Sequence, residues 1–370
     1  MGRPGPVPGF VFTNVNDSEQ TIYDPWLHRF AVLTAIITFL LLGAGGLVTS
    51  HNAGMSVPDW PNSYGYNMFL FPPSKWIGGI FYEHTHRLIA SGVGFLTTIL
   101  AVWLWLKDRR EWMHWVGVAA FLLVVAQGIL GGLRVVLVDA QLGIFHAIIG
   151  QLFFILMCAI VLFTSRFWHG LAAGKSPPTV PPGLRRLVLA ATLLIFCQLI
   201  IGATMRQAHA GLAITDFPAA YGKLWPDTSP AAIAQYNAQR TNAPGLNPIT
   251  AFQVILQMVH RMVALGIFLL VALSAWQGWR RLGKKDSLAK LAMFWLALIC
   301  VQIGLGAWTI WSNKAADVAT AHVLGGALSL MTGALWCIIG FRRPASLPET
   351  APATTMSGTF ATPSAMGTHK

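Results

Sequence analysis

The chain contains 370 residues, of which 55% are hydrophobic and only 10% are charged. This composition excludes an ordinary soluble domain and indicates an integral membrane protein, because long uncharged stretches are what lipid accommodates. The formal net charge of +12 would suit nucleic-acid binding, but the basic residues gather in short connections between apolar runs, which is a signal of membrane topology. We therefore predict no nucleic-acid partner and expect the lipid bilayer as the protein's surroundings.

Eight apolar runs are each long enough to cross about 30 Å of hydrocarbon as a helix. Their hydrophobicity is continuous rather than alternating, which favours helices over a closed β-barrel. We predict spans at residues 30–50, 77–106, 113–133, 140–165, 185–206, 250–276, 288–310 and 317–340. The predicted fold class is an all-α integral membrane protein with eight transmembrane helices.

Most basic residues follow the even-numbered runs, and the other connections carry fewer. Those after the second, fourth, sixth and eighth runs are Lys107, Arg109, Arg110, Arg166, Lys175, Arg185, Arg186, Arg280, Arg281, Lys284, Lys285, Lys290, Arg342 and Arg343. Cytoplasmic loops are enriched in Lys and Arg, so this distribution places both termini inside.

The outer connections repeat one another. Residues 53–61 (AGMSVPDWP) correspond to residues 210–218 (AGLAITDFP), and the Tyr-Gly pair that begins at Tyr64 corresponds to the pair that begins at Tyr221. Further matches are Gln127 and Gly131 with Gln302 and Gly306. Each half contains four helices, an even number, so the halves share one orientation across the membrane.

This repeat predicts two tandem four-helix bundles related by a pseudo-twofold axis along the membrane normal. We assign residues 1–175 to the N-terminal half and residues 176–343 to the C-terminal half. Residues 344–370 are rich in Ala, Thr, Ser and Pro, and we expect a disordered tail there.

Four of the 11 histidines stand at equivalent positions in the even-numbered helices, near their outer ends: His86 and His146 in the first half, His260 and His322 in the second. Two imidazoles from neighbouring antiparallel helices are typical of axial ligands to one heme iron in a four-helix bundle. We therefore predict that each half holds one heme. The alternative for any single histidine is a hydrogen-bonded interior side chain.

Arg87 and Arg261 directly follow two of these histidines. A guanidinium can bind a heme propionate through two parallel hydrogen bonds, or it can extend from the helix end to the membrane interface, and both interpretations stay open. His84 lies about 200° of helical rotation from His86, so we expect it to face outward or to play a supporting role.

The two halves differ at one position beside the histidines. The first half reads Glu83-x-x-His86-Arg87, whereas the second has Gln257 in place of the glutamate. A carboxylate at this point could accept protons, stabilise a developing cation or bind a substrate hydroxyl. The simpler alternative is that Glu83 pairs with a nearby arginine.

Taken together, the Glu-x-x-His-Arg motif, the four spaced histidines, the duplicated eight-helix layout and segment 53–61 resemble the heme A synthase family over about residues 30–340. The resemblance implies that the first half receives heme O and oxidises its C8 methyl group to a formyl group through a hydroxymethyl intermediate. It also implies that His86 and His146 face the substrate heme, that His260 and His322 ligate heme b, and that Glu83 is the catalytic carboxylate.

The same resemblance implies a place in a bacterial cell membrane and an electron acceptor not identified by the sequence. It further implies partnership with heme O synthase and terminal oxidase assembly factors. The chain departs from the family pattern where Thr49 is followed by Ser50 instead of arginine. Two other functions stay open: a non-enzymatic diheme b-type cytochrome, and a heme carrier for oxidase assembly.

Overall fold

The structure is a computed structural model that describes residues 23–172, 180–241 and 248–342. Within these ranges the regular structure is helical, with two isolated β-bridges, Ser63 to Tyr66 and Ala220 to Lys223, in the outer loops. The all-helical class is therefore confirmed. The predicted tail and the boundary near residue 175 lie outside the described residues.

Eight of the helices are long and apolar enough to cross a membrane, as predicted. They are α1 (Pro25–Ser50), α2 (Gly78–Lys107), α3 (Glu111–Val136), α4 (Ala140–Thr164), α6 (Pro182–Gln207), α8 (Ala251–Arg281), α9 (Ser287–Trp311) and α10 (Ala316–Gly340). Two shorter helices, α5 (Arg166–Ala172) and α7 (Pro230–Thr241), and the 3-10 turns Met68–Leu70, Pro73–Lys75 and Ala210–Leu212 complete the described secondary structure.

Capping residues set where several helices begin. The Asp24 carboxylate accepts hydrogen bonds from the backbone N–H groups of Trp26 and Leu27, so α1 begins at Pro25 rather than at the predicted residue 30. Thr250 and Gln253 form a reciprocal capping box at the start of α8. These caps satisfy backbone donors that the helix itself leaves unpaired.

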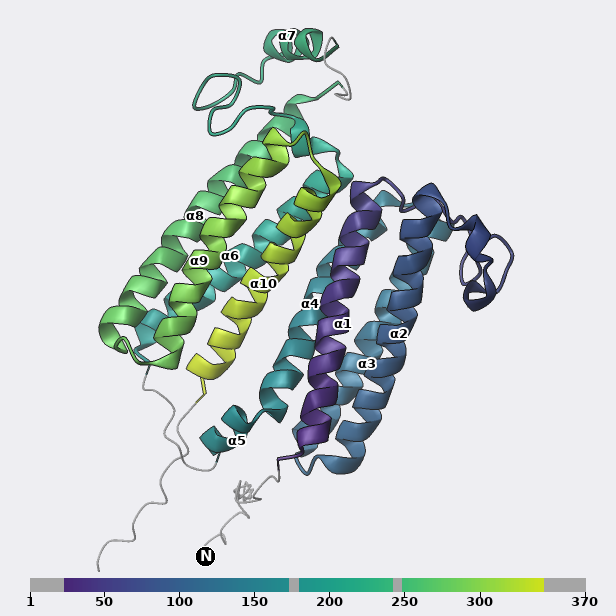
Figure 1. Cartoon of the computed structure of the whole chain (residues 1–370). Coiled ribbons are helices and arrows are strands. Elements are labelled where there is room, and N and C mark those ends of the chain that lie inside the picture. Colours follow the sequence, from purple (N-terminus) through teal and green to yellow (C-terminus); the bar gives the residue numbers. More distant parts are fainter. Residues whose placement is uncertain (1–22, 173–179, 242–247, 343–370) are drawn as a thin grey trace, which may run out of the picture.

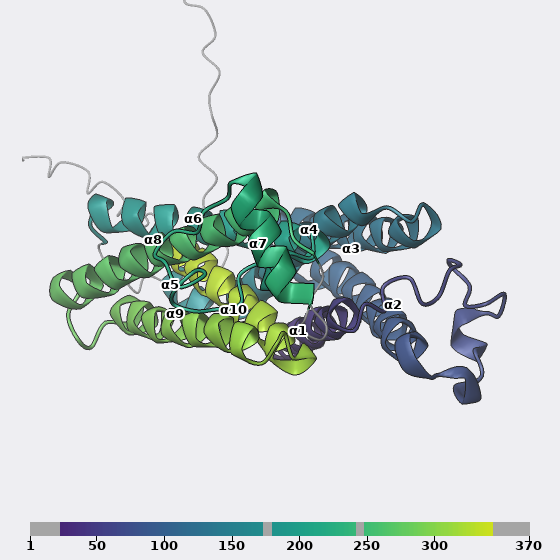
Figure 2. The ribbon, with the colours of Figure 1, turned by 90° about the horizontal axis from the view of Figure 1, so that it is seen from above.

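The eight long helices pack as two neighbouring sets of four (Figures 1 and 2). In the first set α1 contacts α2 and α4, and α3 contacts α2 and α4; in the second, α6 contacts α8 and α10, and α9 contacts α8 and α10. The sets meet where α10 contacts α1 and α4, and where α4 contacts α6. The pseudo-twofold relation and the inside location of both termini stay predictions.

Two tryptophans fill the core of the second set. The Trp295 indole N–H donates to the backbone carbonyl of Ser329, and the Trp336 indole N–H donates to that of Leu288. Both side chains are fully buried, and the paired N–H groups remove the cost of burying a polar atom. Gly333 of α10 lies directly under the Trp295 ring and beside the Thr192 hydroxyl.

This packing predicts that Gly333→Ala destabilises the protein. The new methyl group would collide with Trp295 and Thr192, and overpacking of this kind costs about 1–3 kcal/mol. Gly304→Ala in α9 is the matched control, because nothing lies within 4 Å of its Cβ position. Thermal unfolding of the solubilised protein should give a lower midpoint for the first variant only, and equal midpoints would refute this account of the core.

Candidate functional site

The four predicted histidines form two pairs, one in each set of helices. The ring centroids of His86 (α2) and His146 (α4) are 6.5 Å apart, and those of His260 (α8) and His322 (α10) are 6.4 Å apart. An imidazole nitrogen binds a metal at about 2 Å with its ring centroid about 1 Å further out, so two axial imidazoles place their centroids about 6 Å apart. Both pairs therefore fit one heme iron each.

Each of these imidazole rings lies against a glycine of a neighbouring helix. A Cβ atom built on that glycine would be 3.1–3.2 Å from the ring carbon Cε1 at three of the four sites, where a larger residue would press on the ring, and 3.6 Å away at Gly202, which is an ordinary contact. The contacts are Gly45 (α1) with His86, Gly131 (α3) with His146, Gly202 (α6) with His260 and Gly306 (α9) with His322. The glycines thus help to set the orientation of every ring.

The Nδ1 atoms of all four rings are buried and make no hydrogen bond of ordinary length. Interior polar side chains that serve only packing normally have hydrogen-bond partners. The spacing of the ring centroids, and not these contacts, is what favours paired ligands over hydrogen-bonded interior histidines.

A cavity of about 650 Å³ lies among the helices of the first set. Its volume is within the range of small-molecule and cofactor sites. His86 and His146 line it, as do Glu83, Arg87 and the aromatic ring of Trp60 from the outer loop. Its wall also includes Ala203, Arg206 and Gln207 of α6 and Val323 of α10, so the second set of helices helps to enclose it.

Glu83 is 4% exposed and lies at the edge of this cavity. Its Oε1 atom forms an ion pair with Arg87 Nη2 at 2.9 Å, and its Oε2 atom accepts a hydrogen bond from the backbone N–H of Val57 at 2.9 Å. The pairing with a nearby arginine that the sequence left open is therefore present. Gln257 accepts the equivalent hydrogen bond from Ile214 N–H through Oε1. Both side chains thus anchor the outer loop of their own half.

The arginines that follow the histidines also hold these loops. Arg87 donates to the backbone carbonyls of Val57, Asp59 and Asn62, and Arg261 donates to those of Asp216 and Ala219. The binding of heme propionates by these two arginines stays a prediction. In the structure both guanidinium groups hydrogen-bond to the backbone of the outer loops.

The two outer loops have the same internal hydrogen bonds. Asp59 accepts from the backbone N–H groups of Tyr64 and Gly65, as Asp216 does from those of Tyr221 and its neighbouring glycine. Partial burial alone would raise the pKa of Asp59, but these N–H groups stabilise its carboxylate and bring the pKa below its ordinary value.

His84 does not face outward, contrary to one of the two expectations. Its side chain is fully buried, its Nδ1 atom lies 3.1 Å from the Ser63 hydroxyl, and its ring packs against Phe71 and Trp76. The helical rotation was read correctly, but the outer loop folds over that face of α2. His84 therefore supports the loop and does not line the cavity of the first set.

Three polar residues of the cavity were not identified as site residues from the sequence: Arg134 at the end of α3, and Arg206 and Gln207 at the end of α6. The two arginines were counted only as charges of the outer connections. Their position at the end of an apolar run was the available signal, because a cation buried near hydrocarbon usually has a functional reason.

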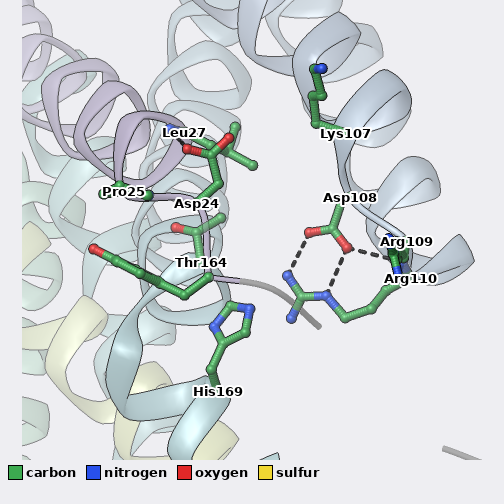
Figure 3. A pocket seen from close by; sticks show the side chains of 10 residues that line it. Asp24, Pro25, Leu27, Lys107, Asp108, Arg109, Arg110, Thr164 and His169 are labelled. Carbon is green, nitrogen blue, oxygen red and sulfur yellow. Dashed lines mark hydrogen bonds and ion pairs between the residues drawn. The ribbon is translucent and has the colours of Figure 1, made fainter. Parts of the chain in front are cut away.

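A second, smaller cavity of about 340 Å³ lies at the opposite end of the first set (Figure 3). It is lined by basic residues of the connection after α2, where Arg110 pairs with Asp108, and by Asp24 and His169. It lies away from the histidine pairs and takes no part in the site described here.

The fold and the site define the class of protein: a polytopic membrane protein with two histidine pairs, each suited to one heme. Comparison with known proteins is consistent with this. The family model described as COX15-CtaA, cytochrome oxidase assembly protein, matches residues 28–334. The chain belongs to this family.

Several bacterial relatives extend the comparison. The heme A synthase of Shewanella oneidensis is 25% identical over 332 residues, which cover 83% of this chain and 93% of the relative. That of Rhizorhabdus wittichii is 24% identical and covers 86% and 94%. That of Shouchella clausii is 28% identical and covers 59% and 71%. Together with the eight spans, these relatives support a multi-pass protein of a bacterial cell membrane.

The loop contacts of Glu83 predict a difference between two substitutions. Glu83→Ala removes both the ion pair and the acceptor for Val57 N–H, so the outer loop should become more accessible to protease and its amides should exchange faster. Glu83→Gln keeps an acceptor in place, as Gln257 does in the second half, and should leave the loop close to wild type. Equal loop protection in wild type and Glu83→Ala would contradict the anchoring role.

Proposed function

We propose that this protein is a heme A synthase, an oxidoreductase that converts the C8 methyl group of heme O to a formyl group through a hydroxymethyl intermediate. Its membership of the cytochrome oxidase assembly family and its relatives named heme A synthase support this proposal. The observation that carries it is an asymmetry between otherwise matching sites. The histidine pair of the first half shares a cavity with a carboxylate, whereas the second half has an amide in the equivalent place.

In this proposal His86 and His146 bind the iron of the substrate heme and so fix the plane of the macrocycle within the cavity. A fixed plane presents one edge of the substrate to the reactive side, which lowers the entropic part of the barrier. Arg87 keeps the outer loop closed over this edge through its three carbonyl contacts. Closure would exclude bulk water from the reacting carbon.

Glu83 is the proposed catalytic carboxylate. Oxidising the hydroxymethyl group to a formyl group removes two electrons, which pass to an electron acceptor outside the chain, and two protons, one of which a carboxylate at the cavity edge can accept. Its ion pair with Arg87 and the hydrogen bond from the Val57 N–H fix the orientation of the carboxylate at the cavity edge.

His260 and His322 are the proposed ligands of the resident heme b, and Arg261 closes the outer loop of that half. Heme b, when bound, supplies one-electron transfer. The amide of Gln257 holds its loop without adding an ionisable group beside the cofactor. We further propose an electron acceptor outside the chain, with heme O synthase and terminal oxidase assembly factors as the proteins that deliver the substrate and receive the product.

The test is expression in cells that make heme O, followed by extraction and chromatography of the hemes. Wild type should produce heme A, with some hydroxymethyl precursor. Glu83→Gln should retain heme b and a closed outer loop but form less than about one hundredth of the product, because general acid–base groups contribute about 10²–10⁴-fold to rate. Absence of both products in wild type would reject the proposal, and undiminished product in the variant would reject the role of Glu83.

A diheme b-type cytochrome is a second candidate, and the nearly equal spacing of the two histidine pairs favours it. Such a protein would hold both hemes firmly and show two reversible redox couples. The enzyme should instead hold one heme. We expect His260→Ala and His322→Ala to abolish the low-spin spectrum of heme b, and His86→Ala to leave it. Equal loss in all three variants would favour the cytochrome.

A further inference from the structure

We propose that Arg134 and Arg206, assisted by Gln207, form a carboxylate-binding site at the outer end of the first cavity and hold the propionate groups of the substrate heme. The identity of the ligand rests on the proposed function. The site itself is inferred from two partly buried cations that come from different sets of helices and line the same cavity.

Arg134 has no acidic partner of its own. Among the described residues, the ion pairs are Arg87 with Glu83 and Arg110 with Asp108. The Nε atom of Arg134 is buried and makes no hydrogen bond. A partly buried cation at the end of a membrane span is costly when it has no ion pair, so its presence favours a ligand with negative charge.

The space around Arg134 is provided by two glycines. A side chain at Gly54 of the outer loop would collide with the guanidinium, and one at Gly143 of α4 would meet both Arg134 Nε and Gln207 Nε2. These contacts place Arg134 and Gln207 beside each other at the start of α4. Their N–H groups together offer a planar fork and an amide donor, which suit a carboxylate.

Arg206 reaches the cavity from the second set of helices. Its Nη2 atom donates to the backbone carbonyl of Gly46 and to the Ser50 hydroxyl, both at 3.0 Å, and both on α1. These two bonds fix the guanidinium against the first set, and its other nitrogens have no hydrogen bond among the described residues. The first cavity is therefore completed by a residue of the second half.

Arg87 is less suited to this task. Its two terminal nitrogens already donate to three loop carbonyls and to Glu83. Rotating them toward a propionate would release the loop that covers the cavity. Arg134 and Arg206 have free donors and make no such contribution to the loop.

The equivalent positions in the repeat are not basic. In the sequence register set by the matched histidines and outer loops, Arg134 corresponds to Thr309 and Arg206 to Thr49. Gly143, which makes room for Arg134, corresponds to Ala319. The positions equivalent to Arg134 and Arg206 therefore carry no cation, and the position equivalent to Gly143 carries no glycine, although the histidine geometry is the same in both halves.

The test compares two probes that differ only in their carboxyl groups: iron protoporphyrin IX and its dimethyl ester. Each is titrated into the purified full-length protein that carries its resident heme, and binding is followed by the bis-imidazole absorption. Wild type should bind the free acid at least about tenfold more tightly than the diester. Arg134→Gln and Arg206→Gln should each lose most of this preference while binding the diester as wild type does.

Arg109→Gln is the matched control, because it removes the same charge from an exposed position at the opposite end of the first set. It should keep the full preference, and heme b content should be equal in all of these proteins. The inference is overturned if wild type binds neither probe, if it does not prefer the free acid, or if both arginine variants discriminate as wild type does. Carboxylate preference in a protein that forms no heme A from heme O would reject the proposed function and leave this site intact.

Discussion

The meeting of two imidazoles across facing antiparallel helices is the constraint on which the rest of this structure depends. Ligand nitrogens on opposite faces of one macrocycle require ring centroids about 6 Å apart, and both pairs meet that requirement. Each imidazole ring also packs against a glycine of a neighbouring helix, one on each of α1, α3, α6 and α9. Helices without a histidine ligand thus contribute by coming close enough to hold the rings.

The outer loops form a second duplicated element above the histidine pairs. In each half an arginine one residue after a histidine, and a Glu or Gln three residues before it, hold the loop by its backbone. A glutamate in the first half can therefore replace the glutamine of the second half with little loss of stability, because Glu83 and Gln257 accept equivalent backbone hydrogen bonds. It adds an ionisable group beside only one histidine pair, so two similar pockets can differ in chemistry without differing in fold.

Much of this was predictable from the sequence because lipid leaves few choices. Continuous apolar runs predict helices, and repeated histidines at matching positions predict paired ligands. The helix ends were less predictable, since Asp24 and Pro25 start α1 through capping that hydrophobicity does not report. Helix α7 was missed for a similar reason: it is a polar surface helix within the longer second outer loop, and Pro230 at its start was the available signal.

The placement of a site residue was predictable where it depends on a single helix. It was not predictable where it depends on the packing of several segments. Glu83 and His86 share a face of α2, and the motif alone indicates this. The burial of His84 depends on Ser63, Phe71 and Trp76 of a loop that folds back over the helix, so helical rotation alone could not decide between an outward-facing and a supporting role.

Arg134 and Arg206 lie far apart in the sequence and line one cavity because α6 packs against α4. Such convergence across the two sets gives the first cavity its cationic end.

The central claim is that two pockets of similar geometry serve different purposes, one for exchangeable substrate and one for a resident cofactor. The most direct measurement loads the purified protein with ⁵⁷Fe-labelled heme O and then chases it with excess unlabelled heme O, with the extracted hemes quantified by mass spectrometry. We expect the labelled heme to be displaced while heme b stays at one molecule per chain. Labelled heme retained as firmly as heme b, or heme b lost together with it, would show that the two pockets do not differ in this way.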